Sequence, residues 1–185
     1  LGKIDVQGTD AVTFLNKIYC NAFAKLAVGK TRYGLMLRED GIAMDDGTAA
    51  RLADDHFVVT TTTANAVSVF RHMEFARQCL WPDFDVQLIS TTEAWAQYAV
   101  AGPNARNLLQ KIVDPEFDLS NDGFPFMACA NVTVCGGLRA RLFRISFSGE
   151  LAYEIAVPTR YGDAMIRHLM QAGEEFDAVP YGTEA

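Results

Sequence analysis

Residues 34–52 read GLMLREDGIAMDDGTAARL, and this stretch sets the fold of the first half of the chain. Its two apolar runs flank Glu39-Asp40-Gly41, a pattern typical of a β-hairpin. The second run meets Asp45-Asp46 at a point where the strand should continue. Because strand side chains alternate between faces, one carboxylate would point inward, where it needs a partner or a ligand. The alternative is that both residues cap a turn before Gly47.

The residues before this hairpin recur later in the chain. Residues 6–18 resemble residues 100–112, an offset of 94 positions. In each copy a β-branched strand ends at Gly, and Asp or Asn then precedes Ala and a helical apolar pattern. Thr9 in one copy and Pro103 in the other fall in the region where the helix begins. The repeat predicts two halves of similar structure.

The remaining pattern completes each half. We expect a strand over 55–60, a helix over 61–77 with Ala66, Phe70 and Met73 on one face, and an edge or linking strand over 84–90. The second half contains a hairpin, 130–135 and 138–147, with a bulge near Leu142-Phe143, then a strand over 153–158 and a helix from Thr159. Each half therefore reads strand, helix, hairpin, strand, helix. This order predicts an α+β fold, with two antiparallel sheet halves of the split βαβ type at 1–90 and 91–185.

Composition narrows the class of function. The chain has 185 residues, half of them hydrophobic, and a net charge of -7, so it can bury a core and is not expected to bind nucleic acid or a membrane. It has neither a signal peptide nor an apolar run of membrane-spanning length. Its four cysteines form no C-x-x-C pair, which favours buried reduced thiols in a cytoplasmic protein without a metal site.

General catalytic motifs are missing: the sequence has no P-loop, dinucleotide-binding glycine motif, H-E-x-x-H or G-x-S-x-G. The three histidines are scattered, and we expect each to pack in the fold or face solvent rather than act in catalysis: His56, His72 and His168. Three arginines on one expected strand either bind an anion or form a solvated face: Arg139, Arg141 and Arg144.

Glu154 raises the same question as Asp45, because it interrupts an apolar strand between Tyr153 and Ile155. A buried glutamate opposite a ring with two donors accepts two hydrogen bonds and confers specificity. The alternative is a solvent-facing residue on a half-exposed strand.

Three ordered segments resemble the glycine-cleavage T-protein (aminomethyltransferase) family. Residues 33–37 with Asp45-Asp46 are similar to its folate-binding hairpin, 98–104 to its strand leading to Gly-Pro-Asn, and 148–155 to its T-G-E-x-G-[YF]-E-I segment. Within the family, the chain is most similar to the folate-binding region in the C-terminal half of the α subunits of heterotetrameric sarcosine oxidases. Further segments carry that likeness: 33–48, 80–82, 95–103, 143–154 and 180–185.

The resemblance implies a tetrahydrofolate site between the two halves. Asp45 matches the family's essential aspartate near the reactive folate nitrogen, and Glu154 the residue that grips the pterin ring. Tyr33 matches an aromatic residue lining the cavity, and Leu1 a pocket methionine. The implied reaction combines a sarcosine-derived imine with tetrahydrofolate, giving glycine and 5,10-methylenetetrahydrofolate.

The resemblance also implies a larger assembly. The chain is expected to be part of a longer polypeptide, inactive as an isolated piece, with other sarcosine oxidase subunits as partners. A third barrel-like domain and the FMN, FAD, NAD and zinc sites would lie outside these residues. The alternatives are an aminomethyltransferase, a dimethylglycine-oxidising relative, or a folate-binding assembly factor without catalytic activity.

Overall fold

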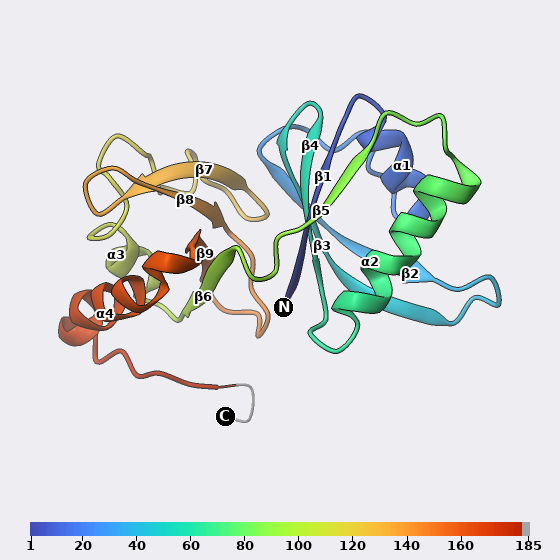
Figure 1. Cartoon of the computed structure of the whole chain (residues 1–185). Helices are drawn as coiled ribbons and strands as arrows, with labels where there is room; N and C mark the ends of the chain where they lie inside the picture. Colours follow the sequence, from blue (N-terminus) through green and yellow to red (C-terminus); the bar gives the residue numbers. More distant parts are fainter. Residues whose placement is uncertain (183–185) are drawn as a thin grey trace. The chain divides into compact units, whose positions relative to one another are not determined.

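The computed structural model describes residues 1–182, which form two compact units. The first unit spans Leu1–Glu93 and the second begins at Ala94. Each unit combines an antiparallel sheet with helices that cover one of its faces (Figure 1). The predicted α+β class is therefore confirmed.

The first unit contains a five-stranded sheet of order β2-β3-β4-β1-β5. The strands are β1 (Gly2–Gln7), β2 (Lys30–Leu37), β3 (Ala43–Ala53), β4 (His56–Thr61) and β5 (Gln87–Ser90). All its neighbouring strands are antiparallel, so β4 and β5 run in the same direction on either side of β1. Helix α2 (Ala66–Phe75) connects them, which makes the split βαβ unit. The predicted edge strand is confirmed as β5, three residues shorter at its start.

The core of the first unit lies between this sheet and two helices. Helix α1 (Ala11–Ile18) and α2 turn their apolar faces to the sheet, which gives a cluster centred on Ile4, Val6, Phe14, Leu15, Phe57, Val59, Val69 and Met73. Helix α2 begins later than predicted because β4 continues to Thr61, and it ends in a π-helical turn, Ala76–Leu80. Met73 is buried as expected, whereas Phe70 is only partly buried and Val69 is buried beside it.

The second unit repeats the arrangement of the first. Its sheet has the order β6-β9-β8-β7, formed by β6 (Trp95–Ala101), β7 (Cys129–Val134), β8 (Leu138–Phe143) and β9 (Ala152–Pro158). This corresponds to β1-β4-β3-β2, so the sequence repeat is also a structural repeat. Helices α3 (Ala105–Leu109) and α4 (Gly162–Gly173) cover its core, and short 3₁₀ segments flank α4 at Thr159–Tyr161 and Glu174–Phe176.

The predicted bulge near Leu142-Phe143 is wrong. The pairing of β7 with β8 runs without a register shift from Cys129↔Phe143 to Val134↔Leu138. Consecutive residues at the end of β8 are buried on both faces of the sheet, so the loss of alternation reflects two-sided burial. Register shifts occur instead in the first unit, next to Met36 and next to Arg51.

The prediction that the four cysteines are buried is only partly correct. Cys129 is buried, as expected, whereas Cys20, Cys79 and Cys135 are exposed. The three exposed residues lie outside the core-facing positions, in the loop after α1, in the π-helical turn, and in the β7–β8 turn. Residue type alone predicts burial of cysteine, and local position overrides it here.

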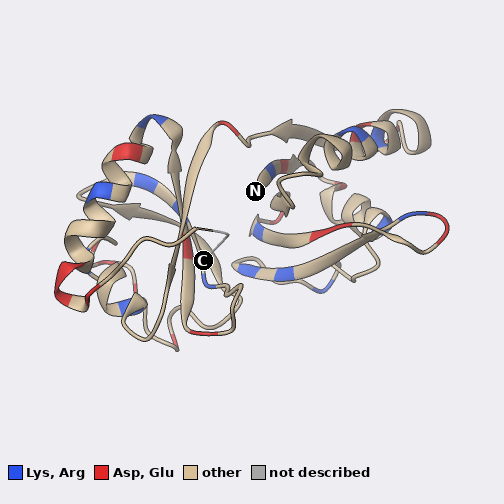
Figure 2. Cartoon of the chain, turned by 90° about the horizontal axis from the view of Figure 1, so that it is seen from below, with Lys and Arg blue, Asp and Glu red and all other residues tan. Residues whose placement is uncertain are grey.

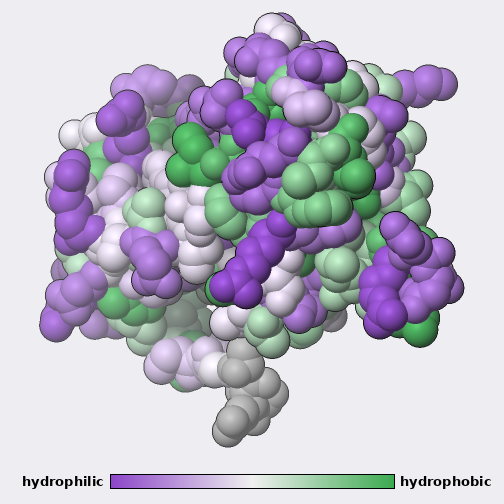
Figure 3. Space-filling model, turned by 45° about the vertical axis from the view of Figure 1, so that its right-hand side comes forward, coloured by the Kyte–Doolittle hydropathy of each residue, from purple (hydrophilic) through white to green (hydrophobic). Residues whose placement is uncertain are grey.

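The surface is mixed in character. On the face shown in Figure 3, small hydrophobic patches are separated by hydrophilic side chains. Within residues 1–182, no helix has the length and apolar character that crossing a membrane requires.

The two copies of the repeat share one backbone device at the strand-to-helix turn. Gly8 and Gly102 have φ values of +132° and +121°, which side-chain-bearing residues rarely adopt. The helix then starts after Asp10 or Asn104, whose dihedral angles are nearly equal. The two glycines differ in their surroundings: a Cβ on Gly8 would lie 2.0 Å from the carbonyl oxygen of Asp85, and a Cβ on Gly102 would meet nothing within 4 Å.

We predict that Gly8→Ala destabilises its unit more than Gly102→Ala destabilises the other. Gly102→Ala meets only the backbone penalty, about 1–3 kcal/mol, and Gly8→Ala adds a steric overlap with backbone. Urea unfolding measures both effects, because the two tryptophans report separately: Trp81 in the first unit and Trp95 in the second. Each variant is made with the other unit's tryptophan changed to Phe. Equal losses would show that Asp85 does not crowd Gly8.

Candidate functional site

Asp45 lies within β3, which continues through Asp45-Asp46 without a turn. It is paired with Met36 of β2, whose side chain belongs to the core under the helices. Asp45 therefore points toward the helix-covered face, and only 7% of its surface is exposed. Of the two alternatives drawn from the sequence, the inward-facing carboxylate is therefore correct, and turn capping by Asp45-Asp46 is wrong.

Three donors hold the Asp45 carboxylate. Thr62 donates its backbone N–H to Oδ2 (3.1 Å) and its hydroxyl to Oδ1 (2.6 Å). Asn65 donates its side-chain amide to Oδ1 (3.1 Å) and to the carbonyl oxygen of Met44 (3.1 Å). Both residues lie between the end of β4 and the start of α2. The carboxylate is thus tied to the junction of strand and helix by hydrogen bonds that compensate for lost hydration.

A buried phenol lies in the electrostatic field of Asp45. Tyr19 follows α1 and forms a β-bridge with Met36, the residue opposite Asp45. Burial, together with the charge of Asp45, raises the pKa of Tyr19 well above its ordinary value. Tyr19 therefore remains a neutral neighbour of the carboxylate.

Asp46 and Tyr33 lie on the opposite face of the same hairpin. Leu35 pairs with Asp46, so alternation places Tyr33 and Asp46 on one side. The hydroxyl of Tyr33 donates to the Asp46 carboxylate, and this bond is the main cause that raises the pKa of Tyr33. Tyr33 is 51% exposed, so its ring is available to a ligand. Asp46 therefore does not cap the hairpin turn, which lies earlier, at Gly41.

Glu154 of the second unit is also held by a neighbouring amide. It lies in β9, and its neighbours Tyr153 and Ile155 are in the core, so Glu154 points away from the helices. Gln97 of β6 donates its side-chain amide to the Glu154 carboxylate. Glu154 is half-buried, so its exposure lies between the buried glutamate and the solvent-facing residue that the sequence left open.

The first residue, Leu1, is 54% exposed, and its carbonyl oxygen accepts a hydrogen bond from Lys3 Nζ (3.3 Å). The structure brings Asp45 and Tyr33 onto one hairpin but onto opposite faces. Sequence reasoning missed the residues that hold the two carboxylates: Thr62, Asn65 and Gln97. The only sequence signal for them was polar residues next to a predicted helix start or within an apolar strand.

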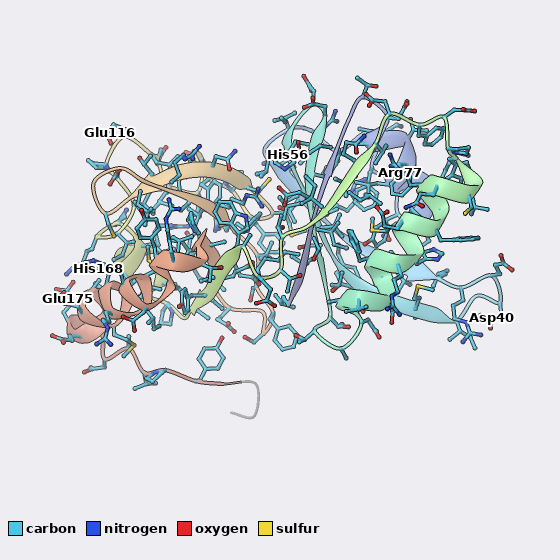
Figure 4. All side chains as sticks on the ribbon, viewed as in Figure 1. Asp40, His56, Arg77, Glu116, His168 and Glu175 are labelled. Atoms are coloured by element: carbon cyan, nitrogen blue, oxygen red, sulfur yellow. The ribbon has the colours of Figure 1, made fainter. Side chains whose placement is uncertain are left out.

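The other histidine and arginine candidates mostly contact groups within their own unit of the protein. His56 bonds the buried Asp5 carboxylate (3.0 Å), and His56 and His168 come from different elements (Figure 4). Arg141 is buried against the Trp95 ring (4.2 Å), and Arg144 donates to the Phe124 carbonyl oxygen (2.7 Å). A solvated strand face is therefore wrong for these two arginines. Acidic and basic residues are interspersed along both units (Figure 2).

Comparison with known proteins identifies the family of this chain. The family model described as the GCVT N-terminal domain matches residues 1–185. The sarcosine oxidase α subunit of Rhizobium meliloti (strain 1021) is 57% identical over all of this chain, which spans 18% of that subunit.

Two solved structures share the fold. The glycine cleavage system aminomethyltransferase T from Bartonella henselae matches 91% of this chain and 43% of its own, with a TM-score of 0.76 and 26% identity. A chain of the heterotetrameric sarcosine oxidase from Corynebacterium sp. U-96, in complex with pyrrole 2-carboxylate, matches 98% of this chain over 83% of its own length, with a TM-score of 0.68. Its identity of 14% shows a likeness of fold alone.

The repeated units, the hairpin with its inward aspartate, and the family match over the whole chain lead to one conclusion. This chain belongs to the GCVT N-terminal domain family.

Proposed function

We propose that this chain is the tetrahydrofolate-binding, methylene-transfer region of a sarcosine oxidase α subunit. The observation that carries the proposal is the Asp45 carboxylate, buried and anchored by Thr62 and Asn65, in a chain 57% identical to such a subunit. The proposed reaction joins a sarcosine-derived imine to tetrahydrofolate and releases glycine and 5,10-methylenetetrahydrofolate.

Each site residue has a chemical role in this proposal. Asp45 accepts a hydrogen bond from the reactive folate nitrogen, orients it, and takes up the proton lost when that nitrogen attacks the imine carbon. Glu154 accepts hydrogen bonds from the pterin ring and is held for this by Gln97. The exposed Tyr33 ring and the Leu1 side chain supply apolar contact with the ligand.

The residues available fit a folate in their donor and acceptor chemistry. A reduced pterin presents N–H donors, and both candidate site carboxylates, Asp45 and Glu154, are acceptors held in place by donors of the protein. We expect the oxidation itself, the FMN, FAD, NAD and zinc sites, and the partner subunits of a hetero-oligomer to belong to the rest of a cytoplasmic enzyme. The Rhizobium meliloti relative is named as the α subunit of its sarcosine oxidase, and this supports the expectation of partner subunits.

A second candidate is an aminomethyltransferase, favoured by the fold match of 0.76 to the Bartonella henselae protein. Both candidates use the same folate chemistry and differ in the source of the one-carbon unit. The substrate that supports methylenetetrahydrofolate formation by the complete protein distinguishes them: sarcosine for the first, an aminomethyl group on a lipoyl carrier for the second.

We predict that Asp45→Asn weakens tetrahydrofolate binding by the complete α subunit about 10- to 100-fold, because it removes a charge-assisted hydrogen bond. Glu154→Gln should weaken binding by up to about tenfold, since the amide still accepts one hydrogen bond. Anaerobic calorimetric titration with tetrahydrofolate measures both.

Asp40→Asn is the matched control, because Asp40 lies on the same hairpin and pairs with Arg38 at the exposed turn. Equal affinities for wild type, Asp45→Asn and Glu154→Gln would refute the site.

A further inference from the structure

The arrangement around Asp45 leaves little freedom for its carboxylate. A carboxylate offers about four acceptor positions. Within residues 1–182, three of these are filled, two on Oδ1 and one on Oδ2. All three partners donate, so Asp45 acts toward them as an acceptor, and one acceptor position remains on Oδ2.

Asn65 holds the Asp45 carboxylate instead of capping its own helix. It occupies the N-cap position of α2, where an asparagine side chain ordinarily accepts a hydrogen bond from a backbone N–H of the first turn. Here it makes no such bond. Its amide instead donates to Asp45 Oδ1 and to the Met44 carbonyl oxygen, which fixes both the side chain and the backbone of the strand beside it.

Thr62 complements Asn65 from the other side. Its backbone N–H and its hydroxyl address the two oxygens of the carboxylate separately. Rotation of the carboxylate about its bond to Cβ would break both of these bonds. The plane of the carboxylate, and therefore the direction of the remaining acceptor position, is set by Thr62 and Asn65 together.

We propose that Thr62 and Asn65 are positioning residues that aim one acceptor position of Asp45 at a ligand N–H, and so select a reduced pterin over an oxidised one. This inference rests on the proposed function. Tetrahydrofolate carries a hydrogen on N5, whereas N5 of fully oxidised folic acid carries none. A fixed acceptor forms a hydrogen bond with N5–H of tetrahydrofolate. With folic acid, the same acceptor faces the lone pair of N5 and forms no hydrogen bond.

The test is the ratio of dissociation constants for folic acid and tetrahydrofolate, measured anaerobically on the complete α subunit. We predict that Thr62→Val and Asn65→Ala each weaken tetrahydrofolate binding about 3- to 10-fold while folic acid binding stays unchanged, so that the ratio falls. A purely structural role would lower affinity for both ligands and leave the ratio unchanged.

Matched variants control for packing and folding. Thr63→Val, next to Thr62 and exposed, should keep the wild-type ratio, as should Thr62→Ser, which retains the hydroxyl donor. Asn65→Ser keeps a residue suited to the N-cap but is too short to replace the amide, so it should lower the ratio even if Asn65→Ala does not fold.

The outcomes separate the two proposals. If Asp45→Asn lowers the ratio while Thr62→Val and Asn65→Ser leave it unchanged, the positioning role is wrong and the proposed function stands. If Asp45→Asn itself changes neither affinity, the proposed function fails at this site.

Discussion

Gly47→Ala lowers the free energy of unfolding of the first unit by about 3 kcal/mol, at the upper end of the range for overpacking. A Cβ on Gly47 would lie 2.0 Å from the carbonyl oxygen of Thr60 and 2.8 Å from its carbonyl carbon. Both obstructing atoms are backbone in a paired strand, so they cannot rotate away as a side chain does. Relief requires β3 and β4 to separate.

The matched control is Gly41→Ala in the hairpin turn. Gly41 has φ +82°, and a Cβ added to it would meet nothing within 4 Å, so its replacement meets only the conformational penalty, about 1–2 kcal/mol. Urea unfolding followed by Trp81 fluorescence, with Trp95 changed to Phe, measures both variants. A loss for Gly47→Ala no greater than for Gly41→Ala would contradict the close approach of the two strands.

This result bears on the candidate site as well as on stability. The approach of Gly47 to Thr60 sets the distance between β3 and β4, and Asp45 lies two residues before Gly47 while Thr62 lies two residues after Thr60. A strand displaced at Gly47 therefore moves the Asp45 carboxylate away from its donors. We expect Gly47→Ala to weaken tetrahydrofolate binding together with stability.

Tyr153→Ala lowers the free energy of unfolding of the second unit by about 3–5 kcal/mol, the range for truncating a large buried aromatic. Tyr153 has no exposed surface, and its ring stacks on Phe124 with centroids 6.4 Å apart. Arg106 donates to its hydroxyl (3.0 Å), and the Arg144 guanidinium lies 5.9 Å from its ring centre. Removal of the ring leaves a cavity and deprives Arg106 of a partner.

Tyr153→Phe separates these effects. It keeps the ring and removes only the hydrogen bond to Arg106, so it should cost about 1 kcal/mol. Urea unfolding followed by Trp95 fluorescence, with Trp81 changed to Phe, reports on this unit. If the two variants lost equal stability, the hydroxyl rather than the ring would dominate, and the packing described for Tyr153 would be wrong.

Local patterns predicted much of the fold. The apolar runs on each side of the Glu39-Asp40-Gly41 turn signal predicted the β2–β3 hairpin, and the recurrence of residues 6–18 at 100–112 predicted the repeated strand–glycine–helix turn that Gly8 and Gly102 form. These features are encoded within short stretches, where period and turn chemistry act directly. The alternation of apolar residues was misleading at Leu142-Phe143, because burial on both faces of a strand interrupts it without any change of register.

The candidate site was likewise only partly predictable from the sequence. Sequence by itself determined the family, the two sheets, and the choice of Asp45 and Glu154 as carboxylates within apolar strands. Only the tertiary structure decided that Asp45 faces inward, that Asp46 pairs with Tyr33, and that Thr62 and Asn65, 17 and 20 residues further on, hold the Asp45 carboxylate. The physical reason is that these bonds depend on the register of β3 against β4. That register depends on packing between the strands and on the close approach of Gly47 to Thr60 of β4, a residue distant in the sequence, and the pattern around Asp45 does not encode it.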